Sequence, residues 1–110
     1  MNPQTFSWLL IAASIAAEVA GTVAMRYSDG LTRPLPSLVT GISYLFAIWS
    51  MSLAVRHLEV GLAYAVWAGT GTALIALAGM LWLGESTAPT RIIALLLIVL
   101  GVLLLKAHSG

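Results

Sequence analysis

The stretch "IAAEVAGTVAMRYS", residues 15–28, holds one carboxylate, Glu18, within an apolar run that ends only at Arg26. In water this would be an ordinary buried acid awaiting a partner. In lipid an unpaired charged carboxylate costs several kcal/mol, and acids at such positions mark functional sites by default. The medium around this stretch therefore decides both fold and function.

The composition indicates lipid. Of the 110 residues, 60% are hydrophobic and 8% are charged, and the mean hydropathy is +0.99. Soluble domains carry about 25% charged residues, and a chain of this length could not bury so much apolar surface in one core. The net charge of +1 without a basic stripe argues against nucleic acid as a partner. With no Cys, and with His57 and His108 far apart in sequence, we expect no metal site and no cofactor.

Four apolar stretches predict an all-α integral membrane protein with one transmembrane domain over residues 1–110. Each is close to the ~20 residues that a helix needs to cross hydrocarbon, and none alternates like a barrel strand. Pro34, Pro36 and Pro89 precede expected helices, and Gly30 and Gly84 lie in expected turns. The first stretch lacks a basic n-region, so we expect a span there and not a signal peptide. The expected spans are about 6–26, 37–55, 60–83 and 90–106.

The basic residues barely favour either orientation. One side of the membrane would hold Arg56 and Lys106, and the other would hold Arg26, Arg33 and Arg91. Because the positive-inside rule gives almost no preference, we predict that the chain inserts both ways. Two oppositely inserted copies would form an antiparallel homodimer and reproduce the inverted repeat of larger carriers.

Glu18 is the only charged residue inside the expected spans away from their ends. Desolvation favours the neutral form of a carboxyl group, so Glu18 can hold a proton, or ionise beside a cation from outside. The pattern therefore predicts proton and cation exchange at Glu18. Ser14 and Thr22 lie one helical turn away on the same face, and we expect both to contact substrate. The alternative is a permanently protonated Glu18 that makes one interhelical hydrogen bond.

Aromatic residues near this level predict cation contacts. Tyr64 and Trp67 are three residues apart and share a helix face, and aromatic faces attract cations where water is scarce. Gly69 and Gly71 predict a hinge within the same span. The alternative for the aromatic residues is an anchoring role in an interfacial belt. The four expected aromatic substrate contacts are Trp8, Tyr44, Tyr64 and Trp67.

The fourth span has no polar side chain before Lys106 and cannot line a path for a charged molecule. Ala94 and Gly101, seven residues apart, form a small stripe on its Leu/Ile/Val surface. Small residues allow close helix packing in membranes, so we expect this stripe to contact a second copy of the chain. Lipid contact alone is the alternative.

Four segments together resemble the small multidrug resistance family of bacterial inner-membrane exporters, over nearly the whole chain. They are "AEVAGTVAMRYSDGLTR" at 17–33, "PSLVTGISYLFAIW" at 36–49, "GLAYAVWAGTG" at 61–71 and "GVLLL" at 101–105. The resemblance implies four transmembrane helices, an antiparallel homodimer and export of cations in exchange for protons. It also implies that Glu18 is shared by protons and substrate, that Gly69 and Gly71 match the bend of the third helix, and that Gly101 matches a dimer-contact glycine.

Within that family the residues favour export of quaternary ammonium and other lipophilic cations. The guanidinium-exporting branch usually has Trp three residues after its Glu, where this chain has Gly21, and tends to lack an aromatic at the position of Tyr44. The tail "LLLKAHSG" resembles the guanidinium branch, so guanidinium or polyamine export remains as the alternative. A non-transporting membrane scaffold is the alternative of another class. With no nucleophile–base pair and no phosphate loop, we do not expect an enzyme.

Overall fold

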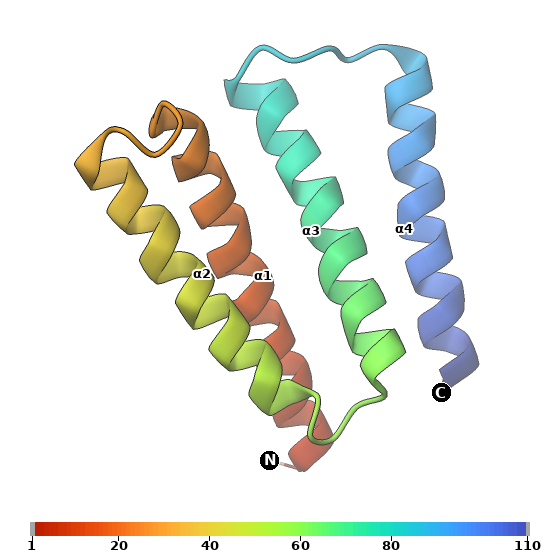
Figure 1. Ribbon diagram of the computed structural model, residues 1–110. Helices are drawn as coiled ribbons and strands as arrows, with labels where there is room; N and C mark the ends of the chain where they lie inside the picture. The colour runs from red at the N-terminus through yellow and green to blue at the C-terminus, as the bar shows by residue number, and fades with distance from the viewer. Residues whose placement is uncertain (1, 110) are drawn as a thin grey trace.

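The computed structural model describes residues 2–109, which form four helices joined by short loops (Figure 1). The helices are α1 (Pro3–Tyr27), α2 (Pro34–Ala54), α3 (Val60–Trp82) and α4 (Pro89–Ser109). The α1–α2 hairpin packs most closely, α3 packs against α1, and α4 packs along α3. Each helix is long and apolar enough to cross a membrane.

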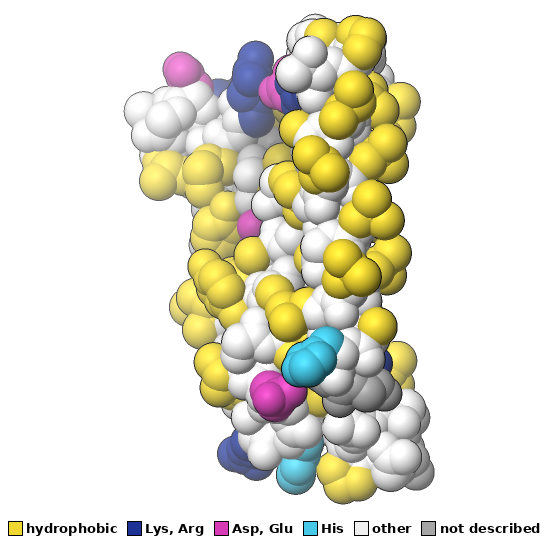
Figure 2. Space-filling view, turned by 90° about the vertical axis from the view of Figure 1, so that its right-hand side faces the viewer, with side chains coloured by type: hydrophobic (Ala, Val, Ile, Leu, Met, Phe, Trp, Pro, Cys, Tyr) yellow, Lys and Arg dark blue, Asp and Glu magenta, His cyan; other side chains and the backbone are white. Residues whose placement is uncertain are grey.

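The chain ends and the α2–α3 loop lie at one end of the molecule, here called the terminal end, and the other two loops lie at the opposite loop end (Figure 1). Figure 2 shows Lys, Arg, Asp, Glu and His side chains gathered toward both ends of one face. Hydrophobic side chains cover much of the surface between them, with one small acidic patch at mid-height. This distribution fits a chain that crosses a membrane between its two charged ends.

The helix starts differ from the expected spans because of local capping. Pro34 and Pro89 are the first residues of α2 and α4, and Pro36 lies in the first turn of α2, so none of the three precedes its helix. At the first helical position a Pro lacks only an N–H that would have had no partner in the helix. Asn2 caps α1, with its Oδ1 accepting from a backbone N–H at 2.7 Å. Gly30 and Gly84 lie in turns with φ of +69° and +68°, as expected.

A seam of small residues joins α1 to α2. The hydroxyl of Ser14 donates to the carbonyl of Ala47 at 2.8 Å, and the hydroxyl of Thr40 donates to the carbonyl of Gly21 at 3.0 Å. A seven-residue spacing keeps one face of each helix toward the other, and small residues allow close approach in lipid. The hairpin is therefore held by packing and by hydrogen bonds in both directions. The buried seam residues are Ser7, Ser14 and Gly21 on α1 and Thr40, Ala47 and Ala54 on α2.

Helix α4 is attached to the rest of the chain along one face only. Val102 and Ile98 pack over Gly69 of α3, where a Cβ would collide with the Val102 side chain. Among the described residues, none in the apolar window of α4 is buried. Ala94 and Gly101 are exposed, and no atom of residues 2–109 lies within 4 Å of a Cβ built on Gly101. Their contact with a second copy stays a prediction.

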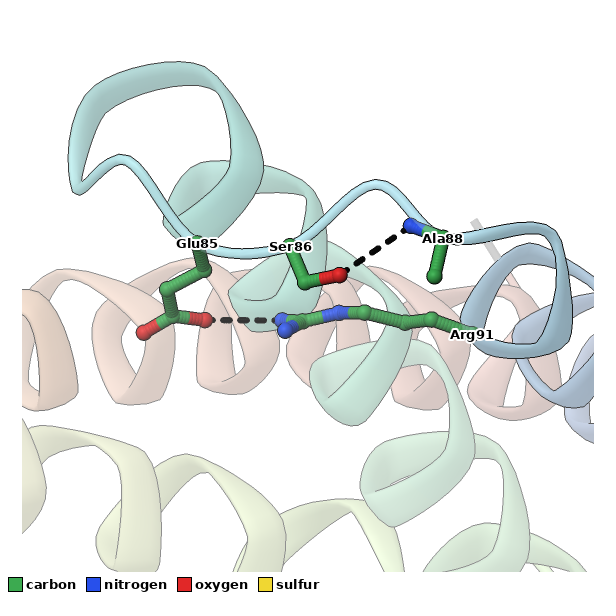
Figure 3. Close-up of polar contacts among 4 residues, drawn as sticks. All are labelled: Glu85, Ser86, Ala88 and Arg91. Carbon is green, nitrogen blue, oxygen red and sulfur yellow. Dashed lines mark hydrogen bonds and ion pairs between the residues drawn. The ribbon is translucent and has the colours of Figure 1, made fainter.

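An ion pair closes the α3–α4 loop at the loop end (Figure 3). Arg91 Nη2 donates to Glu85 Oε1 at 2.7 Å, and the backbone N–H of Glu85 donates to the carbonyl of Gly79 at 3.0 Å. The Glu85 carboxylate occupies the space that a Cβ on Gly79 would need. Ser86 Oγ accepts from the backbone N–H of Ala88 at 3.2 Å, just before α4 begins. These contacts fix the turn from which α4 starts.

Candidate functional site

A pocket of about 180 Å³ opens between α1, α2 and α3 in the middle of the molecule. Glu18 comes from α1 and Trp67 from α3, and the other lining residues come from α2. Its lining contains one carboxyl group and no basic side chain. The lining residues are Glu18, Tyr44, Ala47, Ile48 and Trp67.

The Glu18 side chain is held against α3. A Cβ built on Gly71 would lie 2.8 Å from Glu18 Oε2 and 3.7 Å from its carboxyl carbon. Gly71 itself is buried. The absence of a side chain at this position therefore lets the carboxyl group reach the α3 backbone.

Tyr44 is placed by two residues of α1. Its ring lies over Gly21, where a Cβ would be 2.8 Å from Tyr44 Cδ1 and 2.9 Å from Cε1. Its hydroxyl is 2.6 Å from the hydroxyl of Thr22, with either atom able to donate. Thr22, an expected substrate contact, is not among the residues that line the pocket and touches one of them, Tyr44. Gly21 leaves the space that the Tyr44 ring fills.

Trp67 and Tyr64 form a tilted pair, with ring centroids 5.7 Å apart and an interplanar angle of 51°. Trp67 lines the pocket, and its Nε1 is buried with no hydrogen-bond partner among residues 2–109. Tyr64 is 59% exposed and is not among the residues that line the Glu18 pocket. It lines a neighbouring apolar groove of about 310 Å³ that also includes Ile48 and Trp67.

Two expected substrate contacts lie elsewhere in the structure. Ser14 is fully buried in the α1–α2 seam, where its hydroxyl donates a hydrogen bond to the carbonyl of Ala47. Trp8 lies near the terminal end, with Lys106 Nζ 5.2 Å from its ring centroid. Neither residue lines the Glu18 pocket, because α2 covers the part of α1 that carries Ser14, and Trp8 lies ten residues, or ~15 Å, along α1 from Glu18.

Gly69 and Gly71, the expected hinge, lie inside the uninterrupted helix α3. They face different neighbours, with Gly69 against α4 and Gly71 against Glu18. Two residues along an α-helix correspond to about 200° of rotation, which explains the opposite directions. Both glycines therefore serve as contact positions here, and their role as a hinge stays a prediction.

Sequence patterns alone did not identify Ala47 and Ile48 as lining residues. Both look like ordinary lipid-facing or packing residues in a uniformly apolar span, and no local signal distinguishes them. The contact between Gly21 and Tyr44 also needed the structure. Its only trace in the sequence is a glycine in the middle of a membrane helix.

The lining combines one carboxyl group with the aromatic rings of Tyr44 and Trp67, groups that attract a cation when the carboxyl group is ionised. An ionised Glu18 has no basic side chain lining the pocket to neutralise it, so a cation from outside can take that place. The faces of Tyr44 and Trp67 add attraction for positive charge. A proton on the carboxyl group would remove the negative charge and with it most of the attraction.

Comparison with known proteins gives relatives over almost the full chain. Residues 6–98 match the family described as Small Multidrug Resistance protein. A guanidinium exporter of Citrobacter freundii is 41% identical over 103 residues, covering 94% of this chain and 98% of that protein. A guanidinium exporter of Salmonella typhimurium gives the same values, and one of Escherichia coli O6:H1 is 38% identical over the same shares. These names go against our placement in the quaternary ammonium branch and favour the guanidinium alternative.

The family match fits the structure, which has four membrane-length helices with an acid between them. Its members are transporters and not enzymes. The chain is therefore a multi-pass membrane protein of the small multidrug resistance family.

Proposed function

We propose that the chain exports guanidinium-type cations across the bacterial inner membrane in exchange for protons, with proton and cation alternating at Glu18. The observation that carries this proposal is the pocket in which Glu18 is the only ionisable carboxyl group and no basic side chain lines the wall. A site that must be neutral either by protonation or by a bound cation couples the two ligands through competition.

Two observations support guanidinium. The relatives that match 94% of this chain at 41% identity are named guanidinium exporters. The lining of the pocket also combines one carboxyl group with aromatic rings. A planar guanidinium ion can donate two parallel hydrogen bonds to a carboxylate and place its face on an aromatic ring. Glu18 supplies the carboxylate, and Trp67 and Tyr44 supply the rings.

A second candidate, export of quaternary ammonium cations, is favoured by the contact between Gly21 and Tyr44. A large side chain at position 21 would collide with the Tyr44 ring, since even a Cβ lies 2.8 Å from it. The guanidinium branch usually has Trp at the position of Gly21. In this chain the Tyr44 ring fills the space beside Gly21 and lines the pocket. A quaternary ammonium ion donates no hydrogen bonds and depends on such rings for its affinity.

We also propose that the working unit is an antiparallel homodimer. The exposed face of α4 around Ala94 and Gly101 is apolar and has small residues at a seven-residue spacing. The basic residues are almost evenly divided between the two ends of the molecule, which permits both orientations. A second copy would complete the cavity on the side where the single chain leaves the pocket open.

Transport into proteoliposomes with an imposed pH gradient tests the function. Wild-type protein should drive guanidinium uptake, Glu18→Gln should abolish it, and the control Glu85→Gln, which removes an acid outside the pocket, should keep most of it. Repeating the assay with tetraethylammonium separates the two candidate functions. Faster uptake of guanidinium supports the first, and faster uptake of tetraethylammonium supports the second. Uptake without proton movement in the opposite direction, or uptake that survives Glu18→Gln, would contradict proton exchange at Glu18. No uptake of either cation would leave the scaffold hypothesis as the better account.

A further inference from the structure

A second polar cavity lies at the terminal end, away from the Glu18 pocket. Its volume is about 260 Å³, far more than one bound water needs. A wider hollow of about 530 Å³ shares Glu59 and Leu62 with it and is bounded by Leu105 and His108. The smaller cavity, here called the terminal cavity, is lined by Gln4, Trp8, His57, Leu58, Glu59, Leu62 and Lys106.

Lys106 reaches this cavity from the inner face of α4. It follows Ile98 and Val102 at four-residue spacing, the row that packs over Gly69 of α3. Gly101 lies about 140° around the helix from Lys106 at ~100° per residue. The terminal cavity therefore lies on the opposite side of α4 from the expected dimer contact, so a second copy on that face would leave it free.

The ammonium group of Lys106 lies 5.2 Å from the ring centroid of Trp8. Glu59 lines the same cavity, yet no ion pair joins Lys106 to Glu59 within residues 2–109. The cavity thus offers one cation and one anion that are not neutralised by each other. His57 and Gln4 add groups that can donate hydrogen bonds.

The terminal cavity lies where the apolar, membrane-length helices end. Lys106 is in the last turn of the apolar span Pro89–His108, and lysines at such positions extend toward the lipid headgroups. Trp8 is the type of residue that concentrates at the same level. Leu58 and Leu62 give the cavity an apolar wall. A ligand that is polar at one end and apolar at the other fits these surroundings.

We propose that the terminal cavity binds the headgroup of a phospholipid that carries both a phosphodiester and a primary ammonium. The phosphate accepts hydrogen bonds from Lys106, His57 and Gln4, and the ammonium donates to Glu59. The acyl chains pass along the apolar wall toward the bilayer. An anionic headgroup without an ammonium would leave Glu59 facing negative charge, and a choline headgroup could not donate hydrogen bonds to it. The site is separate from cation export at Glu18 and does not depend on the proposed function.

Native mass spectrometry of the purified protein in detergent tests this site. Phosphatidylethanolamine, phosphatidylcholine and phosphatidylglycerol are added separately, and the concentration that gives half-maximal binding of one lipid per chain is measured. Wild-type protein should bind phosphatidylethanolamine about tenfold more tightly than the other two. Lys106→Gln should weaken that binding about tenfold, Lys106→Arg should retain most of it, and Glu59→Gln should remove the preference over phosphatidylcholine.

Arg56→Gln is the matched control, because it removes a positive charge at the same end outside the cavity lining, and it should leave binding unchanged. Circular dichroism checks that each variant keeps its helices. Equal binding of the three lipids, tighter binding of phosphatidylglycerol, or unchanged binding in Lys106→Gln would overturn the proposal. Soluble phosphoethanolamine that bound as tightly as the lipid would also overturn it, because the site would then select a free phosphate compound.

Discussion

The carboxyl group of Glu18 lies directly against Gly71, at a place where a Cβ on residue 71 would come within 2.8 Å of Glu18 Oε2. This contact links the acid on α1 to the backbone of α3. The carboxyl group that we propose as the exchange site therefore occupies space left by the absence of a side chain on a neighbouring helix. A substitution at Gly71 can therefore test whether the position of the Glu18 carboxyl group matters, separately from its charge.

Gly71→Ala should displace the Glu18 carboxyl group without unfolding the protein, because the crowded atom is the end of a flexible side chain. We expect guanidinium affinity to fall about tenfold, equivalent to ~1.4 kcal/mol. Isothermal titration calorimetry measures the affinity. Gly61→Ala is the control, since it makes the same change in the same helix and nothing lies within 4 Å of its Cβ. Equal affinities in the two variants would show that the contact with Gly71 does not position Glu18.

Gly21→Ala should destabilise the protein by about 1–3 kcal/mol, the usual cost of overpacking, because the new Cβ meets the Tyr44 ring. Most of this cost should disappear when Tyr44 is also replaced by Ala, as a double-mutant cycle would show. Reversible unfolding in detergent gives the free energies. Gly41→Ala, whose Cβ would meet nothing within 4 Å, should instead stabilise the protein by up to ~1 kcal/mol, the helix-propensity gain of an interior Gly→Ala change. If Gly21→Ala destabilised the Tyr44→Ala variant as much as the wild type, the new Cβ would collide with a group other than the Tyr44 ring.

The hydrogen bonds across the α1–α2 seam should contribute measurably to stability. Thr40→Val keeps the shape of the side chain but loses the bond to the carbonyl of Gly21, and we expect a cost of about 0.5–1.5 kcal/mol. Thr72→Val is the matched control, because the Thr72 hydroxyl bonds only to the carbonyl of Ala68 in its own helix. The same unfolding assay compares them. A loss no larger than that of the control would mean that packing alone holds the hairpin.

Dual insertion should be visible with reporter fusions at the C-terminus. Because the Arg and Lys residues are nearly balanced between the two ends, comparable fractions of the chain should place the reporter on each side. Several Lys residues added to the α3–α4 loop should then bias the orientation. If the reporter on the unmodified chain lay almost wholly on one side, the antiparallel homodimer would be excluded.

The spans could be predicted from the sequence because each apolar run is long, continuous and bounded by Pro, Gly or charge. Their ends could be placed only approximately, since capping by Asn2 and the use of Pro34 and Pro89 as first helical residues depend on local geometry. The acid was evident because Glu18 stands alone in its run. That it binds protons and cations stays a prediction.

The neighbours of the acid were harder to predict, because a uniformly apolar helix does not reveal its rotation about its own axis. The structure brings Tyr44 and Trp67 to Glu18. It directs Ser14 into the α1–α2 seam and Trp8 toward Lys106. Sequence spacing could place Ser14 on the same face as Glu18. It could not show that α2 covers that part of the face.

Proton release on cation binding tests the central claim most directly. Guanidinium is added to purified protein in weak buffer, and the pH change is followed for wild type, Glu18→Gln and the control Glu85→Gln. Wild type and Glu85→Gln should release protons, and their guanidinium affinity should fall as pH falls, by up to about tenfold per pH unit for each proton displaced. Glu18→Gln should release none. Proton release that persists in Glu18→Gln would contradict the account, because another group would then carry the exchanged proton.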